Sequence, residues 1–207
     1  QKIDMSDNKT NIIIDFDSTF ASVEALEEIA DIVLKGAPKK KEILDEIKAI
    51  TNLGVDGKIT FNQSLKRRLA LLKIHQDDLE KLIRRLKRKV STSFSRNKAF
   101  FKKYEGQIFI ISNGFKDFID PVVERYGIDG AHVLANTFTY DKKGWVNGFD
   151  EKNLLAHSGG KSKTLKALKL KGESYVIGDA YTDYEMKEAG IAHKFFAFTE
   201  NVLRENI

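Results

Sequence analysis

The stretch "NIIIDFDSTF" at residues 11–20 decides the fold. Its three consecutive isoleucines are β-branched and bounded by polar residues, which predicts a strand over residues 10–15. Because the run is apolar on both faces, it suits a parallel strand with helices on both sides of the sheet. Asp15 and Asp17 follow where the strand ends. Two acids at the end of a buried strand indicate that something is bound there.

Several later segments are also typical of strands. Apolar runs that end in a polar residue predict two further parallel strands at 107–112 and 174–179. Another strand is expected at 192–198, and a β-hairpin or a pair of short strands at 132–149. These segments supply the strands of one α/β sheet.

Helical patterns follow two of the predicted strands. One lies near 121–126, where Asp120 and Pro121 suit an N-cap and a first helical turn. The other lies near 181–189. The region 22–90 differs, because its apolar residues recur at helical spacing and turn residues divide it into about four helices.

The sequence therefore predicts an α/β fold with a Rossmann-like parallel sheet. The core comprises residues 1–21 and 91–207, and a small helical bundle, residues 22–90, is inserted after the first strand. A chain of 207 residues that is 42% hydrophobic and 31% charged has room for such a core. No apolar run approaches the roughly 20 residues of a membrane span, so no membrane partner is expected.

The chain contains no cysteine, which excludes disulfides and thiol-ligated metals. This composition fits a reducing compartment, and the expected location is cytoplasmic. The net charge is +5, and the run "RRLKRK" at 84–89 is the strongest feature in favour of nucleic-acid binding. We expect that run to be the solvated face of a helix and expect no nucleic-acid partner. The oligomeric state is not indicated by the sequence.

Polar residues collect where the predicted parallel strands end. Ligands of open parallel sheets bind beyond these carboxyl ends. Closely packed carboxylates repel one another unless a cation lies among them, and oxygen ligands without His or Cys indicate Mg²⁺. A hydroxyl, backbone N–H groups and a lysine are suitable donors to a phosphate. The residues concerned are Asp15, Asp17, Ser112, Asn113, Gly114, Lys161, Asp179 and Asp183.

Four short motifs, "DFDST", "ISNG", "GGKSK" and "GDAYTD", occur in that order. They resemble the four motifs of the haloacid dehalogenase-like phosphatase superfamily. The longer stretches "DFDSTFASVEALEEIA", "GKITFNQSLKRRLALL" and "GFDEKNLLAHSGGKSK" are similar to the phosphoserine phosphatase family, and the similarity covers nearly the whole chain. The resemblance implies a haloacid dehalogenase-like core, with residues 22–90 as a cap of the C1 type.

The resemblance also implies an activity. This is Mg²⁺-dependent hydrolysis of O-phosphoserine through an aspartyl-phosphate, the last step of serine biosynthesis. Asp15 would be the nucleophile and a metal ligand, and Asp17 the general acid and base with its carbonyl on the metal. Asp179 would be a further ligand, Asp183 would support it, and Lys161 would be catalytic. The alternative is hydrolysis of another small phosphate ester.

Substrate contacts are implied in the same way. Glu24 would bind the amino group, Phe61 would cover the substrate, and Arg68 would hold the carboxylate, for which guanidinium geometry is well suited. Arg67 is the rival of Arg68 for this task. The remaining substrate-binding residues would be Ser112, Asn113, Gly114 and Thr182.

Three features depart from the family pattern. Asn113 replaces the first of two glycines that usually follow the motif serine, and Ala180 stands in "GDA" where "GDG" is commoner. A side chain at Asn113 raises the question whether phosphoserine remains the substrate. Family members usually continue beyond the point where this chain stops, so the 207 residues are expected to be an N-terminal fragment of a longer polypeptide.

Overall fold

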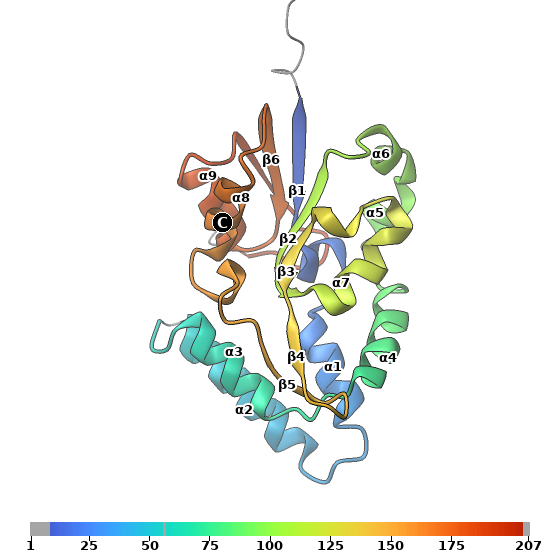
Figure 1. Ribbon diagram of the computed structural model, residues 1–207, viewed down its shortest axis with the longest axis vertical. Coiled ribbons are helices and arrows are strands. Elements are labelled where there is room, and N and C mark those ends of the chain that lie inside the picture. The colour runs from blue at the N-terminus through green and yellow to red at the C-terminus, as the bar shows by residue number, and fades with distance from the viewer. Residues whose placement is uncertain (1–8, 56, 205–207) are drawn as a thin grey trace, which may run out of the picture.

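The sheet is parallel and has β1 at its centre. The structure, a computed structural model, describes residues 9–55 and 57–204 (Figure 1). The strand order is β3-β2-β1-β6-β7, with every neighbouring pair parallel. The strands are β1 (Thr10–Ile14), β2 (Ile108–Phe115), β3 (Val133–Asn136), β6 (Glu173–Gly178) and β7 (Lys194–Ala197). The predicted parallel α/β sheet is confirmed. Of the predicted core and bundle, residues 1–8, 56 and 205–207 lie outside the described residues.

Helices cover both faces of this sheet. The side chain of Ile13 packs in a cluster with α8 (Gly160–Leu168) and α9 (Tyr181–Glu188), whereas Ile12 and Ile14 pack into the larger cluster on the other face. That second face is covered by α7 (Lys116–Val123), with α5 (Thr92–Arg96) and α6 (Lys98–Lys103) beside it (Figure 1). Both faces of the isoleucine run are thus buried, which explains why all of its residues are apolar.

Helix α7 begins earlier than the sequence suggested. Its first residue is Lys116, so Pro121 lies inside the helix and Asp120 is not its N-cap, contrary to expectation. Phe118 and Val122 are both completely buried, four positions apart on the side that covers the sheet. Packing of this apolar face outweighs the hydrogen bond that proline removes from a helix.

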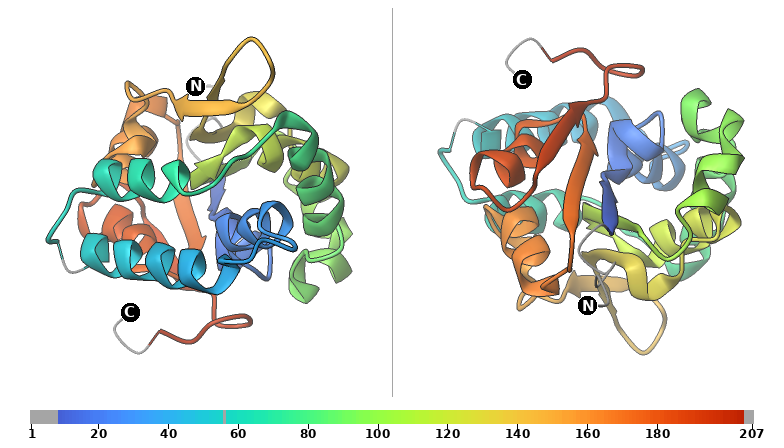
Figure 2. Two further views of the ribbon diagram at one scale, coloured as in Figure 1. Left: turned by 90° about the horizontal axis from the view of Figure 1, so that it is seen from below. Right: turned by 90° about the horizontal axis from the view of Figure 1, so that it is seen from above.

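The segment between β1 and α5 is helical. Its four helices are α1 (Ala25–Val33), α2 (Lys40–Val55), α3 (Phe61–Ala70) and α4 (Gln76–Leu86), as predicted. Seen from below, α2 and α3 lie in front of the sheet, beyond the carboxyl ends of its strands (Figure 2). No helix among the described residues is long and apolar enough to cross a membrane.

Two residues of the basic run at 84–89 form ion pairs with another helix. Arg85 contacts Glu28 at 3.0 Å and Asp31 at 2.9 Å, and Lys89 contacts Glu28 at 3.0 Å. The pairs of Arg85 join α4 to α1, and that of Lys89 joins the turn after α4 to α1. The run thus faces solvent in part, as expected, while the charges of Arg85 and Lys89 are also paired with acids of α1.

A small hairpin links the helical segment to the core. Strands β4 (Phe138–Tyr140) and β5 (Val146–Phe149) pair antiparallel, as the hairpin expectation at 132–149 required, while β3 joins the main sheet. The N–H of Val146 donates to the carbonyl of Ile74 at 2.9 Å, and that of Gln76 to Gly144 at 3.0 Å. The connection between α3 and α4 is therefore fixed to the hairpin. The remaining short helical turns are η2 (Phe16–Phe20), η3 (Glu124–Tyr126), η4 (Gly130–His132) and η5 (Leu154–Ala156).

Candidate active site

The chain turns sharply at the end of β1. The N–H of Phe16 donates to the Asp15 carboxylate at 2.7 Å, and the N–H of Ala21 donates to the Phe16 carbonyl at 2.8 Å, closing the wide turn η2. Ser18 has φ 55°, in the left-handed region that side chains rarely occupy. This turn holds Asp15 at the rim of the sheet and leaves the Phe16 ring completely buried in the core.

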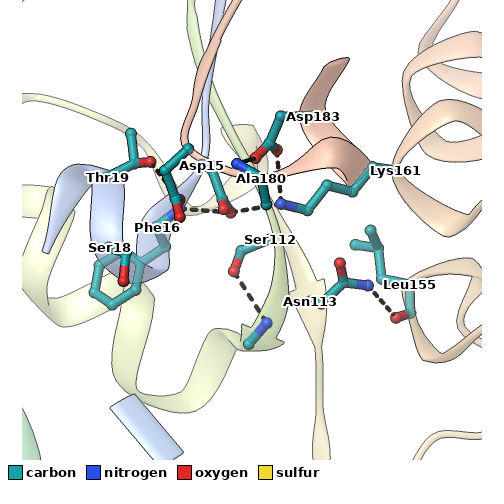
Figure 3. Close-up of polar contacts among 12 residues, drawn as sticks. Asp15, Phe16, Ser18, Thr19, Ser112, Asn113, Leu155, Lys161, Ala180 and Asp183 are labelled. Carbon is teal, nitrogen blue, oxygen red and sulfur yellow. Dashed lines mark hydrogen bonds and ion pairs between the residues drawn. The ribbon is translucent and has the colours of Figure 1, made fainter. Parts of the chain in front are cut away.

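A buried lysine lies between two carboxylates. Lys161 Nζ is 2.8 Å from Asp15 Oδ1 and 2.7 Å from Asp183 Oδ1, and the residue is only 3% exposed (Figure 3). Burial alone would lower the pKa of Lys161, but the two carboxylates more than compensate and raise it. Lys161 therefore stays charged, at the first turn of α8, where the sequence predicted it.

Burial has the opposite effect on the acids. Desolvation, followed by the charge of Asp183, raises the pKa of Asp15 to about 7 although Lys161 opposes the shift. The pKa of Asp183 is also raised, chiefly by burial and against the effect of Lys161. The single positive charge of Lys161 does not offset burial and the mutual repulsion of the carboxylates here.

Asp179 completes the acidic group. Thr19 Oγ1 donates to its Oδ1 at 2.9 Å, and Arg204 contacts its Oδ2 at 2.9 Å. Gly178 leaves room for the neighbouring acid, because a Cβ on this glycine would lie 2.3 Å from Asp183 Cγ. From the sequence, Thr19 is expected at the end of the first strand but without a role, and Arg204 is not indicated. Thr19 lies within the quoted "DFDST" motif, whereas nothing near Arg204 in the sequence points to the sheet rim.

The three acids fit a divalent cation. One ligand oxygen from each of Asp15, Asp179 and Asp183 lies within 4.8 Å of the others, and all three residues are buried. Oxygen-only donors of this kind suit a hard cation such as Mg²⁺. The pKa values of Asp15 and Asp183, raised by burial and by neighbouring negative charge, fit the same interpretation, since a cation would relieve the repulsion.

The end of β2 provides a hydroxyl and an amide. Ser112 is 1% exposed, and its Oγ accepts the N–H of Gly114 at 3.0 Å. The side chain of Asn113 turns away from the acids, and its Nδ2 donates to the Leu155 carbonyl at 2.8 Å (Figure 3). Ser112 is thus buried near the end of β2, while the Asn113 amide is occupied by the backbone of η5.

A second set of polar residues lies toward the helical segment. Asp17 Oδ1 accepts the N–H of Ala25 at 2.8 Å, and Ser18 Oγ donates to Glu24 at 2.6 Å. Burial raises the pKa of Asp17 well above its usual range, and the charge of Glu24 adds to the effect. Asp17 is therefore protonated more readily than an exposed aspartic acid, as a proton donor requires.

Arg68 lies close enough to these acids to interact with their charges, whereas Arg67 is exposed. Arg68 is half-buried, and burial lowers its pKa while the charges of Glu24 and Asp17 act to raise it. Arg67, one position earlier in α3, is exposed. Phe61 is half-buried against the main core, and Thr182 is exposed in the first turn of α9. No contact brings Phe61 or Thr182 to the acids within the described part of the chain.

Comparison with known proteins agrees with this geometry. Residues 12–188 match the haloacid dehalogenase-like hydrolase family, so the chain belongs to that family and is a hydrolase. Among curated relatives, human phosphoserine phosphatase is 29% identical over 199 residues, which are 95% of this chain and 84% of the relative. Phosphoserine phosphatase of Methanocaldococcus jannaschii is also 29% identical over 199 residues, 93% of this chain and 88% of the relative.

Solved structures have the same fold. A phosphoserine phosphohydrolase-like protein from Francisella tularensis superposes with a TM-score of 0.80 at 31% identity, covering 95% of this chain and 90% of the other. A substrate-bound phosphoserine phosphatase superposes with a TM-score of 0.69 at 23% identity, covering 92% and 86%. The likeness of the second extends to the fold alone.

Proposed function

We propose that the protein is a Mg²⁺-dependent phosphomonoester hydrolase whose substrate is O-phosphoserine. The observation that carries the proposal is the buried contact of Lys161 with Asp15 and Asp183, with Asp17 and Ser112 at the same rim. Curated relatives named phosphoserine phosphatase support the choice of substrate. The same reasoning gives a role in serine biosynthesis, and the absence of cysteine supports a cytoplasmic location.

In the first step, a carboxylate oxygen of Asp15 attacks phosphorus and the bond from phosphorus to the serine oxygen breaks. Asp17 donates a proton to that leaving oxygen, which releases serine and leaves phosphate bonded to Asp15. The raised pKa of Asp17, caused mainly by burial, suits this donation.

In the second step, Asp17 takes a proton from water as the water oxygen attacks phosphorus. The bond from phosphorus to Asp15 breaks and phosphate leaves. Lys161 and Ser112 hold the phosphate oxygens in both steps, and Lys161 offsets their negative charge. Mg²⁺, held by Asp15, Asp179 and the Asp17 carbonyl with support from Asp183, would neutralise further charge on the phosphate.

The helical segment supplies the substrate contacts in this proposal. Residues 22–90 are a cap over the core, which comprises residues 1–21 and 91–207. Arg68 holds the serine carboxylate, Glu24 its amino group, and Phe61 covers the substrate, with Thr182 and the backbone of Gly114 on the core side. The proximity of Arg68 to the charges of Glu24 and Asp17 supports this assignment.

The test is phosphate release from phosphoserine with and without Mg²⁺. We expect hydrolysis that a chelator abolishes and that Mg²⁺ restores. A panel containing phosphocholine and sugar phosphates then examines selectivity. Equal rates across that panel would favour another small phosphate ester as the natural substrate, and no release from any ester would refute the proposal.

A further inference from the structure

The side chain of Asn113 forms part of a small amide cluster behind the phosphate-side donors. Its Nδ2 donates to the Leu155 carbonyl at 2.8 Å (Figure 3). The backbone carbonyl of Asn113 accepts a hydrogen bond from Asn136 Nδ2 at 2.8 Å. Asn136 Nδ2 also lies 3.3 Å from the backbone carbonyl oxygen of Leu155. Asn136 is completely buried. The ends of β2 and β3 are thereby both attached to η5.

A third amide fixes η5 from the other side. Asn153 Oδ1 accepts the N–H of Leu155 at 3.0 Å, and its Nδ2 donates to the Ala135 carbonyl at 2.8 Å. Each of these hydrogen bonds joins a side chain to backbone, so they determine where the η5 backbone lies. The turn is positioned by asparagine side chains from three segments.

The turn η5 in turn touches the start of α8. A Cβ on Gly160 would lie 2.3 Å from the Leu154 carbonyl oxygen and 2.9 Å from Leu155 Cα. The two backbones are thus in direct contact at the residue before Lys161. Any shift of η5 therefore moves the base of the Lys161 side chain, whose Nζ lies 2.8 Å from Asp15.

We propose that Asn113 is a positioning residue that sets the spacing between Ser112 and Lys161 by fixing η5 to the end of β2. The inference rests on the proposed function, in which Ser112 and Lys161 hold the same phosphate from two different elements. The Asn113 side chain does this without touching the substrate, because its amide donates to the backbone carbonyl of Leu155. The substituent at this position therefore does not exclude phosphoserine.

The test is the variant Asn113→Ala, which removes the amide but keeps Cβ. We expect kcat to fall about tenfold for both phosphoserine and p-nitrophenyl phosphate, because misplacement of a phosphate-binding group affects both esters alike. KM for phosphoserine should change less than about twofold, and the ratio of kcat/KM between the two esters should stay the same. Amide hydrogen exchange over residues 153–163 should become faster.

A matched control removes a similar bond far from the site. Asn97 Nδ2 donates to the Ser93 carbonyl at 2.7 Å at the exposed junction of α5 and α6. Asn97→Ala should leave kcat, KM and exchange over 153–163 unchanged. If Asn113→Ala does not fold, Asn113→Ser, whose side chain is polar but too short to replace the amide, gives the same comparison.

Two results would overturn the inference. Unchanged kcat and unchanged exchange would show that the amide positions nothing, and a changed preference between the two esters would make Asn113 a substrate contact. If the unmodified protein hydrolyses neither ester, the proposed function fails instead. The exchange measurement then still decides whether Asn113 fixes η5.

Discussion

At Asp15, burial raises the pKa of the carboxyl group and the positive charge of Lys161 lowers it. The residue is 6% exposed and adjoins two further carboxylates, yet Lys161 contacts it directly. Such a residue contributes little to stability on its own, because removing a charge from water costs free energy that one ion pair only partly returns. Its placement fits the proposed reaction, in which the Asp15 carboxylate attacks the phosphorus of a negatively charged phosphate ester.

Replacing Asp15 by asparagine should abolish turnover and leave the fold intact. Asparagine has the same shape but cannot form the aspartyl-phosphate, so kcat for phosphoserine should fall at least about 1000-fold. Thermal unfolding should show a single transition, as in the unmodified protein. Asp45→Asn on the exposed side of α2 is the matched control. Full activity of the Asp15 variant would rule out the proposed nucleophile.

Replacing Arg68 by alanine should weaken phosphoserine binding selectively. Loss of a charge-assisted contact with the carboxylate should raise KM for phosphoserine about ten- to a hundredfold. KM for an aryl phosphate, which has no such carboxylate, should stay within about twofold. Arg67→Ala, at the exposed neighbouring position, is the control. Steady-state kinetics in which Arg67→Ala has the larger effect would reverse the assignment.

At the level of elements, the contact between η5 and α8 leaves no room for a side chain at Gly160. Gly160→Ala should destabilise the protein by about 1–3 kcal/mol, because the new methyl group would meet backbone atoms that cannot rotate away. Thermal unfolding should shift downward by about 2–4 °C for each kcal/mol.

Gly148→Ala tests whether crowding is the cause of that effect. Its Cβ would meet only the side-chain hydroxyl of exposed Thr139, at 3.2 Å, and a small shift of that side chain relieves the contact. The melting temperature of this variant should stay close to that of the unmodified protein. Equal losses of stability for both glycines would show that crowding by backbone atoms at Gly160 is not the cause of the effect.

The elements also show what the sequence could and could not predict. Four of the five strands of the sheet, the four helices of 22–90 and the acids at strand ends follow from local patterns, because apolar runs and their polar ends are local properties. The place of β3 in the parallel sheet does not follow, since the pattern of residues 132–149 predicts only a hairpin or a pair of short strands. The start of α7 does not, since burial of Phe118 and Val122 against the sheet outweighs the Pro121 signal.

Within the site, the residues missed are those whose partners lie far away in the chain. Thr19 meets Asp179 across 160 positions, and Arg204 reaches the same carboxylate across 25 positions. The direction of the Asn113 side chain depends on Leu155, 42 positions away. Only the folded arrangement reveals such pairs, because no spacing in the sequence encodes them.

For the molecule as a whole, the buried acids link stability to pH and to metal. The pKa of Asp15 is raised from 3.8 to about 7, chiefly by burial, so the folded protein keeps a proton that the unfolded chain has lost between these values. Stability without metal should therefore fall as pH rises from about 4 to about 7.

The measurement is thermal unfolding in chelator at pH 5.5 and pH 7.5. We expect the lower melting temperature at pH 7.5, and added Mg²⁺ should raise it there more than at pH 5.5, because the metal binds the deprotonated acids. The variant Asp183→Asn removes one of the repelling charges. The decrease of its melting temperature between pH 5.5 and pH 7.5 should therefore be smaller than that of the unmodified protein. A pH-independent melting temperature that Mg²⁺ leaves unchanged would contradict the linkage.

The central position of β1 has a consequence for synthesis of the chain. This strand leaves the ribosome before both of its partners, because its two hydrogen-bonding edges are satisfied by β2, about 100 residues later, and by β6, about 160 residues later. Synthesis proceeds at about 5–20 residues per second, so β6 follows β1 after on the order of ten seconds. During that time a short apolar strand has an open edge toward other nascent chains. Slower translation of the segment between β2 and β6 should therefore increase aggregation and leave the specific activity of the soluble fraction unchanged.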